Sequence, residues 1–547
     1  MLKKTKRMVA LVLALLMTVG LLAGCGTEGN TPDNPSPDGA GVSKTVVIRC
    51  NEGGFGVQWL HALAEAFEAA YQEEGYKVKL DIIAGSQGAL NEQQIKLGPE
   101  KNDTDIYITG EFNVPSVMQF SYKVMKDEST ALLEPLDDIY YAPAVGADKQ
   151  PEEKTIAERF FPGFADANIY QSDDQWNGKV FTMVPFVNST GIAVNPSVFE
   201  RYGVKLPKTT DELIAAAQTI SEKGKADNVY PYVWAGNNAS SYWLYLWEVL
   251  FAQYSGVSGY MDFLMCNPDS GDMIKDGWQV YEDTGILESL KVMDELLNLD
   301  YSADGAVNFT HTEAQHYLAV GEAGFMVTGD WLLEEMEQDY YDEVSNCMML
   351  KTPVLSVIGT ECGITDEQLS QAVEMVDTGK TDADMVAAVS GLTEEGAARI
   401  RAARNIYPSI GAAVNCMIPA YSDAKDVAKV FLQFMFSEDG CRIVREEGTA
   451  LMPVACESYD VENPTPFMDS VVNLMNNGEA TAIFETYHSA MMRTRSGLSF
   501  FNYSTYGAQV FRSMFMNEEY TAQYIYETEK QYVKESWANY LAYAGLS

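Results

Sequence analysis

The pattern of hydrophobic and polar residues in the first part of the chain predicts strands that alternate with helices. Lys77–Ile83 is apolar at every second position, which is the period of a strand with one buried face. Gln58–Glu73 instead spaces its apolar residues three and four positions apart, which is the period of a helix. The same criteria predict strands at Thr45–Cys50 and Asp105–Thr109 and a helix at Gln87–Leu97.

This order of elements predicts a parallel sheet. Successive parallel strands need right-handed crossover connections, and the intervening helices supply them. Ligands of such sheets bind beyond the carboxyl ends of the strands. The loops to consider are therefore Asn51–Val57 and Gly110–Asn113.

Further along the chain, the pattern is mainly helical. Amphipathic or capped helices are expected at Thr209–Lys223, Ile286–Leu297, Ala424–Phe436 and Glu518–Ala544. Residues 365–404 differ from their surroundings, because they are rich in Ala, Glu, Asp and Thr and contain no aromatic residue. We interpret them as two or three short surface helices inserted into the main fold.

The N-terminus has the features of an export signal. A basic stretch that ends at Arg7 precedes the apolar run Met8–Leu22, which is too short to span a bilayer comfortably. The sequence Leu22-Ala23-Gly24-Cys25 resembles the lipobox of bacterial lipoproteins, in which the cysteine is acylated. We therefore expect a signal peptide at 1–24, lipidation of Cys25, and a flexible linker at 25–43. An ordinary secretory signal with a chance cysteine is the alternative.

Charge and cysteine content exclude several classes of protein. The formal net charge is −41, and removal of residues 1–24 takes away basic residues but no acidic residue, so the mature chain is more negative still. Nucleic acid and anionic lipid would therefore be repelled. The expected membrane attachment is therefore through the N-terminal lipid alone. Seven cysteines other than Cys25 are scattered without a CxxC motif, which indicates neither a disulfide scaffold nor a zinc cluster. One disulfide could form, although small buried thiols are the better interpretation.

Several segments, taken in order, resemble a known family. They are Leu133–Asp138, Asn177–Pro185, Val194–Leu213, Gly321–Trp331, and Ala428–Ser437 followed by Pro453. Together they resemble the family-1 extracellular solute-binding proteins, a group that includes the maltose-binding protein. The resemblance implies an α/β fold with two lobes, each a mostly parallel sheet flanked by helices, and a ligand cleft between them. Residues 365–404 have no counterpart in small members, and Asp330 replaces a residue that is commonly small or proline.

The resemblance also implies a domain organisation and a function. We expect one lobe from 44–150 and 348–437, with the insertion at 365–404, and a second from 151–347 and 438–547. The expected function is capture of a sugar or oligosaccharide by hinge closure and delivery to the permease of an ABC importer. The protein would be a monomer anchored outside the cytoplasm of a bacterium, without a cofactor and without enzymatic activity.

Sugar binding needs flat aromatic surfaces and planar polar groups, because a sugar ring has C–H faces and a rim of hydroxyls. Trp331 is the first candidate, since family members place an aromatic residue there; a core position is the alternative. Asp330 would accept hydroxyl hydrogens, or would cap a helix that begins at Trp331. Trp234 and Asn188 are candidates in loops, and a turn role is the alternative for Asn188.

The first loop offers further candidates. Phe55 and Trp59 could stack on a ligand, although Trp59 equally fits a helix facing the core. The glycines around Phe55 suggest a dinucleotide fingerprint only superficially, because Trp59 stands where the third glycine should be. Glu111, just after the third strand, is a candidate acceptor or a solvated loop carboxylate.

Catalytic and metal-binding motifs are missing from the sequence. The four histidines form neither HExxH nor another ligand spacing, and there is no GxSxG or Walker A motif. We therefore expect no metal site. Two alternatives remain at this point: a surface lipoprotein glycoside hydrolase, with two acids across a groove, and a binding protein for a peptide or phospho-ester, with a basic cleft.

Overall fold

The computed structural model describes residues 43–52, 56–85, 87–110, 112–161, 164–170, 175–186, 188–409, 414–447, 452–456, 465–475, 480–483, 491–502 and 509–546. The predicted signal peptide, Cys25 and nearly all of the predicted linker lie outside these residues. Within them, residues 43–546 belong to one compact unit.

The first sheet has the strand order β11-β3-β1-β2. Its strands are β1 (Thr45–Glu52), β2 (Lys77–Ala84), β3 (Ile106–Gly110) and β11 (Val414–Met417). β1 pairs in parallel with β2 and β3, and β11 is antiparallel to β3. The three predicted strands and their parallel pairing are confirmed, and each strand ends within two residues of its predicted end.

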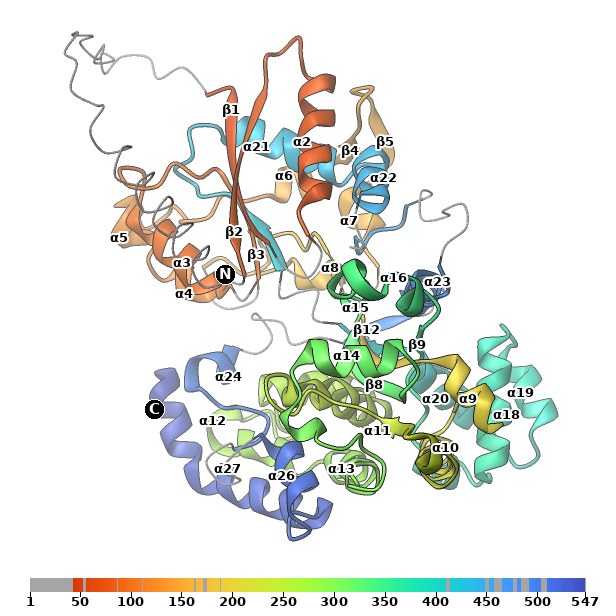
Figure 1. Ribbon diagram of the computed structural model, residues 1–547. Helices are drawn as coiled ribbons and strands as arrows, with labels where there is room; N and C mark the ends of the chain where they lie inside the picture. Colours follow the sequence, from red (N-terminus) through yellow and green to blue (C-terminus); the bar gives the residue numbers. More distant parts are fainter. Residues whose placement is uncertain are drawn as a thin grey trace, which may run out of the picture. The chain divides into compact units, whose positions relative to one another are not determined.

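Both faces of the first sheet are covered. In the central strand β3, Ile106 and Ile108 contribute to one apolar cluster while Tyr107 contributes to another. This arrangement follows from the two-residue period of a strand, because alternate side chains point to opposite faces. One face packs against α2 (Gln58–Ala70), α21 (Lys425–Met435) and α22 (Glu438–Glu446), which Figure 1 shows beside the sheet. α3 (Gly88–Leu97) and α4 (Val114–Met118) lie on the other.

The second sheet has the order β7-β8-β6-β9. Its strands are β6 (Thr190–Val194), β7 (Tyr230–Tyr232), β8 (Ala323–Gly329) and β9 (Met348–Leu350). β7 runs parallel to β8, whereas β6 is antiparallel to both β8 and β9. Three strands therefore share one direction in each sheet, as the expected mostly parallel sheets require. β6 and β8 are buried along their whole length, which identifies them as the centre of the sheet.

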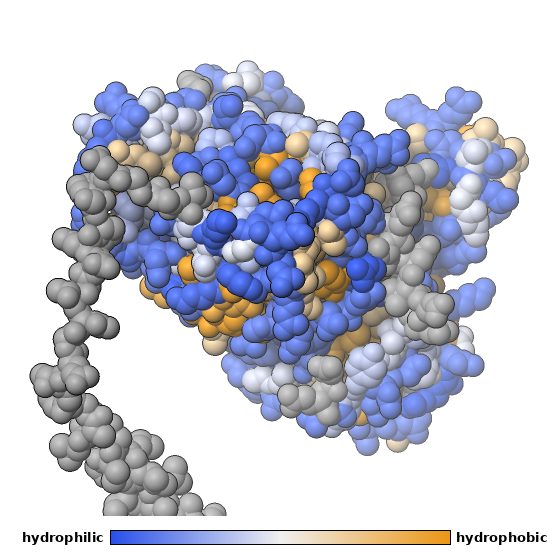
Figure 2. Space-filling view, turned by 90° about the horizontal axis from the view of Figure 1, so that it is seen from above, coloured by the Kyte–Doolittle hydropathy of each residue, from blue (hydrophilic) through white to orange (hydrophobic). Residues whose placement is uncertain are grey.

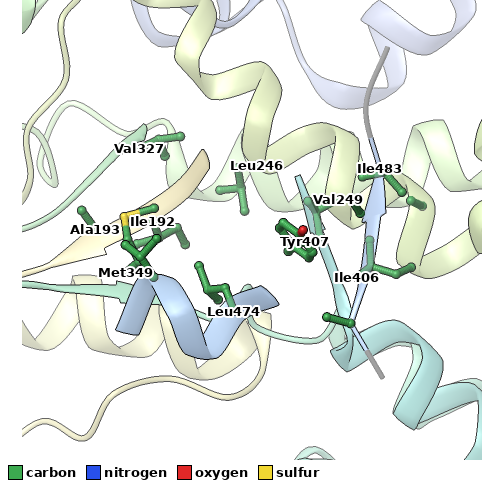
Figure 3. Close-up of a cluster of buried hydrophobic side chains, with 14 of the residues drawn as sticks. Ile192, Ala193, Leu246, Val249, Val327, Met349, Ile406, Tyr407, Leu474 and Ile483 are labelled. Carbon is green, nitrogen blue, oxygen red and sulfur yellow. The ribbon is translucent and has the colours of Figure 1, made fainter. Parts of the chain in front are cut away.

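The core beside the second sheet joins segments that are far apart in the sequence. In Figure 3, Ile192 of β6, Val327 of β8 and Met349 of β9 face Leu246 and other side chains from elsewhere in the chain. Those side chains come from α11 (Trp243–Met265), β10 (Ile406–Pro408), β12 (Thr481–Ile483) and α23 (Pro466–Met475). The late strands β10 and β12 pair in parallel with each other.

The helices around the second sheet include those predicted at Thr209–Lys223, Ile286–Leu297 and Glu518–Ala544. They include α9 (Pro196–Tyr202), α10 (Thr210–Gly224), α13 (Thr284–Leu296), α14 (His311–Ala319), α15 (Leu332–Glu335) and α27 (Ala522–Ala544). The predicted cap at the start of α10 is present, since Thr209 accepts a hydrogen bond from the Glu212 amide at 3.2 Å. α27 packs along α13 (Figure 1).

Short elements complete the described chain. They are α5 (Ser121–Met125), α6 (Asp137–Tyr140), β4 (Pro143–Val145), β5 (Pro151–Thr155), α7 (Ile156–Arg159), α8 (Phe164–Ala167), α12 (Met273–Asp276), α16 (Glu337–Ser345), α17 (Ser356–Glu361), α24 (Met491–Ser496) and α26 (Val510–Met516). Four 3-10 turns add η1 (Lys225–Asp227), η2 (Ser240–Tyr242), η3 (Gly277–Glu282) and η4 (Ala306–Asn308).

The inserted segment forms three helices: α18 (Asp366–Asp377), α19 (Asp382–Ala388) and α20 (Glu394–Arg404). They pack on one another, and α20 also packs on α11. Arg404 fastens the segment, because its guanidinium contacts Asp377 at 2.9 and 2.7 Å and donates to the carbonyls of Lys351 and Thr352. The predicted helical insertion is therefore present, but it accompanies the second sheet.

Two parts of the expected division into lobes differ from the strand pairing. Residues from 348 onward were expected with the first sheet, yet β9 pairs with β6 of the second. Residues from 438 onward were expected with the second, yet α22 packs on α2 beside the first. Pairing between distant segments decides which sheet such elements join, and local sequence patterns do not carry that information.

The surface agrees with the acidic composition. The face drawn in Figure 2 is mainly hydrophilic, with small hydrophobic areas between the polar residues. In the described part of the chain, no helix combines the length and the apolar character that a membrane span requires.

Candidate functional site

The candidate site lies where β7 and β8 end. These two strands are parallel, so their carboxyl ends lie at the same edge of the second sheet. The chain leaves β7 into residues 233–239 and leaves β8 through Asp330 and Trp331. The helices that begin nearby are α11, α14 and α15.

Trp331 is the centre of an aromatic cluster at this edge. Its ring contacts Tyr242 at a centroid distance of 5.7 Å and Tyr245 at 6.3 Å, in both cases edge to face. The ring also lies over Gly329, where an added Cβ would come within 2.3 Å of it. A glycine at 329 is thus what allows the indole to fold back against the end of β8. The Trp331 side chain is mostly buried, with 7% of the residue exposed.

Tyr242 and Tyr245 give the cluster its accessible surface. Both are half-buried and lie three positions apart at the start of α11, with ring centroids 5.3 Å from each other. Burial raises the pKa of Tyr242 to about 12, with a smaller contribution from the charge of Glu335. Both hydroxyls are therefore neutral near pH 7 and able to donate hydrogen bonds. Tyr242 and Tyr245 were not among the predicted site residues, although their i, i+3 spacing is a signal that two side chains share one helix face.

Polar side chains surround the aromatic cluster on α14 and α15. Gln315 donates to the carboxylate of Glu335 through Nε2. Burial raises the pKa of Glu335, and the hydrogen bond from Gln315 and the charge of His311 act in the opposite direction. His311 is joined to Asn238 by two contacts, of 2.9 Å between side chains and 3.0 Å from its own amide. Carboxylate and amide groups are thus positioned next to aromatic rings.

Asp330 and Asn188 have a different position from the one expected. The Asp330 carboxylate accepts from the Ser189 amide at 2.9 Å and from Asn188 Nδ2 at 3.3 Å. The Asp330 amide donates in turn to the Ser189 carbonyl at 2.9 Å. These bonds hold the ends of β6 and β8 together. α15 begins at Leu332 after Trp331, and no side-chain hydrogen bond caps it, so Asp330 does not have the alternative role as its cap.

Burial has a large effect on Asp330. The residue is 2% exposed, and desolvation raises its pKa to about 7, against the hydrogen bonds that favour the carboxylate. Tyr407 of β10 is close enough for the Asp330 charge to contribute to its raised pKa, although burial is the larger cause. Asp330 therefore supports the strand ends that carry Trp331.

The other predicted tryptophans are core residues in this structure. Trp234 is 2% exposed, its ring lies 5.0 Å from Phe515, and its Nε1 has no partner among the described residues. Trp59 is 1% exposed, packs edge to face on Phe186 at 4.6 Å, and donates to the Gly56 carbonyl. For Trp59 the structure favours the core alternative. Trp243 and Trp247, which are four positions apart on α11, are also buried.

The loops after β1 and β3 are described only in part. Phe55 and Glu111 lie outside the described residues. Gly56 is near α15, because a Cβ added there would lie 3.1 Å from Glu334 Oε1. Asn51 at the end of β1 is fixed by bonds with Gly85 and Asn91. Gly56, just before α2, thus lies close to the segment that carries Trp331.

The arrangement suits a ligand that has apolar faces and hydroxyl groups. Aromatic rings can cover C–H faces, while neighbouring amides and carboxylates accept and donate hydrogen bonds. Within the described ranges, no group of three or more His, Cys, Asp or Glu residues is arranged to hold a metal ion.

The fold and this site agree with a comparison against protein families. The model of the bacterial extracellular solute-binding protein family matches residues 57–344, which is more than half of the chain. The chain therefore belongs to that family, as its ordered sequence blocks indicated. Members of the family are solute receptors, and the chain has their two-lobed α/β fold.

Individual proteins are similar to this chain in sequence or in fold. The melibiose/raffinose/stachyose-binding protein MelE of Bacillus subtilis (strain 168) is 28% identical over 178 residues, which is 32% of this chain and 38% of that protein. The match thus spans less than half the length of this curated relative. The solved structure of apo RafE from Streptococcus pneumoniae aligns with a TM-score of 0.55 at 14% identity, covering 90% of this chain and 98% of that one. The solute receptor AcbH aligns with a TM-score of 0.54 at 13% identity over 90% and 98% of the two chains.

Proposed function

We propose that this protein is the substrate-binding component of an ABC importer and captures a sugar or oligosaccharide outside the cytoplasm. Hinge closure would bury the ligand, and the closed form would deliver it to the permease. The observation that carries the proposal is the cluster of Trp331, Tyr242 and Tyr245, with carboxylate and amide groups beside it, at the carboxyl ends of two parallel strands.

The relatives support a sugar as the ligand class. MelE is named for binding melibiose, raffinose and stachyose, and one similar solved structure is RafE in complex with raffinose. AcbH is described as preferring β-D-galactopyranose, and another similar structure is a maltose-bound protein from T. maritima. Galactosides and glucosides therefore both belong in a first ligand panel.

Within this proposal the site residues have separate roles. Trp331 and the two tyrosines form the surface that stacks on the sugar. Glu335 and Gln315 bond to hydroxyl groups, and Phe55 and Glu111 remain predicted contacts from the loops after β1 and β3. Asp330 and Asn188 act indirectly, because their polar atoms bond to the ends of β6 and β8.

The ligand class is tested by calorimetry and tryptophan fluorescence with the full chain. We expect micromolar binding of at least one member of a panel of melibiose, raffinose, stachyose, galactose and maltooligosaccharides. Product analysis of the same mixtures should show the sugar unchanged. Turnover would favour the alternative of a glycoside hydrolase. Binding of a peptide or phospho-ester without sugar binding would contradict the proposal.

The role of Trp331 is tested by the Trp331→Ala variant with the best sugar of that panel. Loss of a stacking ring should weaken binding by about 1–3 kcal/mol, which is roughly a 5- to 150-fold increase in Kd. Trp278→Phe is the matched control, because Trp278 lies on η3 against Lys534, away from the cluster. An unchanged affinity in a folded Trp331→Ala protein would remove Trp331 from the site.

A further inference from the structure

Cys441 and Cys456 are brought together by the fold although nothing in their spacing indicated it. Cys441 lies on α22 and is 1% exposed, whereas Cys456 is half-buried in the short segment 452–456. The Cys456 thiol lies within hydrogen-bonding reach of Cys441. This contact, together with burial, raises the pKa of Cys441 well above its usual range.

Both sulfur atoms border one ion pair. Cys456 Sγ donates to Glu438 Oε2 at 3.0 Å, and Arg159 Nη2 lies 2.8 Å from the other oxygen of that carboxylate. The same Nη2 contacts Cys441 Sγ at 3.9 Å. Figure 1 shows α7, which ends at Arg159, close to α22. Arg159 and Glu438, which bond to each other, therefore contact both thiols and hold them near each other.

The backbone on both sides is also held in place. Arg159 donates to the carbonyl of Phe436 just before α22 and to the carbonyl of Ala455 beside Cys456. The Ala455 amide donates to the Arg159 carbonyl at 2.7 Å, and the Phe161 amide donates to the Pro453 carbonyl at 2.8 Å. A disulfide needs two cysteines that the fold holds near each other, and here the thiols are within hydrogen-bonding reach and both flanking segments are anchored.

Another pair of cysteines in the protein shows the contrast. Cys50 and Cys416 point to the same face of the first sheet, but Ile108 lies between them in register with both. Strands are about 4.8 Å apart, so these two residues are separated by about 10 Å and cannot be bridged.

We infer that Cys441 and Cys456 form a disulfide bond that joins α22 to the segment 452–456. The inference rests on the proposed location outside the cytoplasm, where disulfides persist. The oxidant is a protein disulfide or a low-molecular-weight disulfide. The accessible Cys456 passes its proton toward Glu438 and attacks one sulfur of the oxidant, releasing the first thiol. Cys441 then attacks Cys456 Sγ and releases the second, so two thiols are oxidised and one disulfide is reduced.

The bond has a structural consequence. Residues 457–464 lead along the chain from this segment to α23, which packs beside the second sheet. The disulfide fixes the point at which this connection leaves the elements around the first sheet. Its main effect on stability comes from restricting the unfolded chain.

The test uses two samples of the full chain. One is isolated from the cell surface, and the other is made in a reducing cytoplasm and then exposed to oxidised glutathione. After denaturation and alkylation without reductant, mass spectrometry should find one cross-linked pair of peptides that contains Cys441 and Cys456 and separates on reduction. Reductant should lower the Tm by about 5 °C. Alkylation of both residues in the unreduced surface-derived protein and in the glutathione-treated protein would overturn the inference.

Variants separate the bond from general effects. Cys441→Ala and Cys456→Ala should each lower the Tm, and reductant should then have no further effect. Cys362→Ala is the control. Cys362 is partly exposed like Cys456, but it lies at the end of α17, next to the inserted helices, and is not part of the proposed bond. That variant should keep the full response to reductant. If reductant left the Tm of the wild-type protein unchanged, the inferred disulfide would be contradicted. Sugar binding is measured in a separate experiment, so a failure to bind sugar would not be confused with the presence or absence of the disulfide.

Discussion

At the scale of single residues, Asp330 shows how burial changes the meaning of a side chain. The sequence presents it beside Trp331 as an acceptor for a ligand. In the structure, its two oxygens already accept from Ser189 and Asn188. A carboxylate so deeply buried is expensive to ionise, and its pKa of about 7 follows from that desolvation. Its contribution should therefore appear in stability more than in direct ligand contact.

This difference predicts a pH dependence that belongs to Asp330. Its pKa is raised in the folded state, so the folded protein holds the proton more tightly than the unfolded chain between about pH 4 and pH 7. Stability from this group is complete below about pH 4 and is lost as the pH rises through 7. Between pH 5 and pH 7.5, urea unfolding of the wild type should lose about 2 kcal/mol through Asp330.

The comparison that isolates the effect is Asp330→Asn, which cannot titrate. This variant is expected to be less stable at pH 5, because its side-chain NH2 would face either the Ser189 amide or Asn188 Nδ2, both of which are donors. Its stability should lack the Asp330 part of the pH dependence. Parallel curves for the two proteins across this range would show that Asp330 keeps an ordinary pKa.

At the scale of elements, helix ends were predicted well because their signals are local. α10 was expected from a Thr-Thr-Asp start, and Thr209 caps it. Tertiary structure adds a second function that the sequence does not reveal. The Thr209 hydroxyl also donates to Asp366 on α18 at 2.8 Å, so one side chain connects α10 to the inserted helices.

Thr209→Ala should consequently destabilise the protein by about 1–2 kcal/mol, since it removes a cap and an inter-helix hydrogen bond together. Chemical denaturation monitored by circular dichroism measures this loss. Thr209→Ser retains the hydroxyl and is the matched control, for which a loss well under half as large is expected. Equal losses in both variants would assign the effect to the methyl group.

At the scale of the whole molecule, the N-terminal sequence bears on where the site operates. We propose that Cys25 is lipidated and that this lipid is the attachment to the membrane. Two features of the sequence support this proposal: the short apolar run and the small residues before Cys25.

Cys25→Ser should release the protein from cells into the medium while leaving sugar affinity unchanged, because Cys25 is not among the proposed ligand contacts. Fractionation with an antibody, together with incorporation of labelled palmitate, measures both attachment and acylation. A variant that stays bound to the membrane without a label would contradict lipidation.

The sequence by itself determined the class of fold, the first three strands, several of the longer helices, and the family, because periodicity, caps and ordered motifs are carried by neighbouring residues. It also predicted Trp331 as a ligand contact, which stays a prediction. Tertiary structure alone decided that β9 and the inserted helices join the second sheet, since strand pairing depends on distant segments. It likewise decided which aromatic residues are core and which are accessible. Trp234 and Trp59 became buried, whereas Tyr242 and Tyr245 met Trp331, because burial is a property of the packed molecule and not of the residue type.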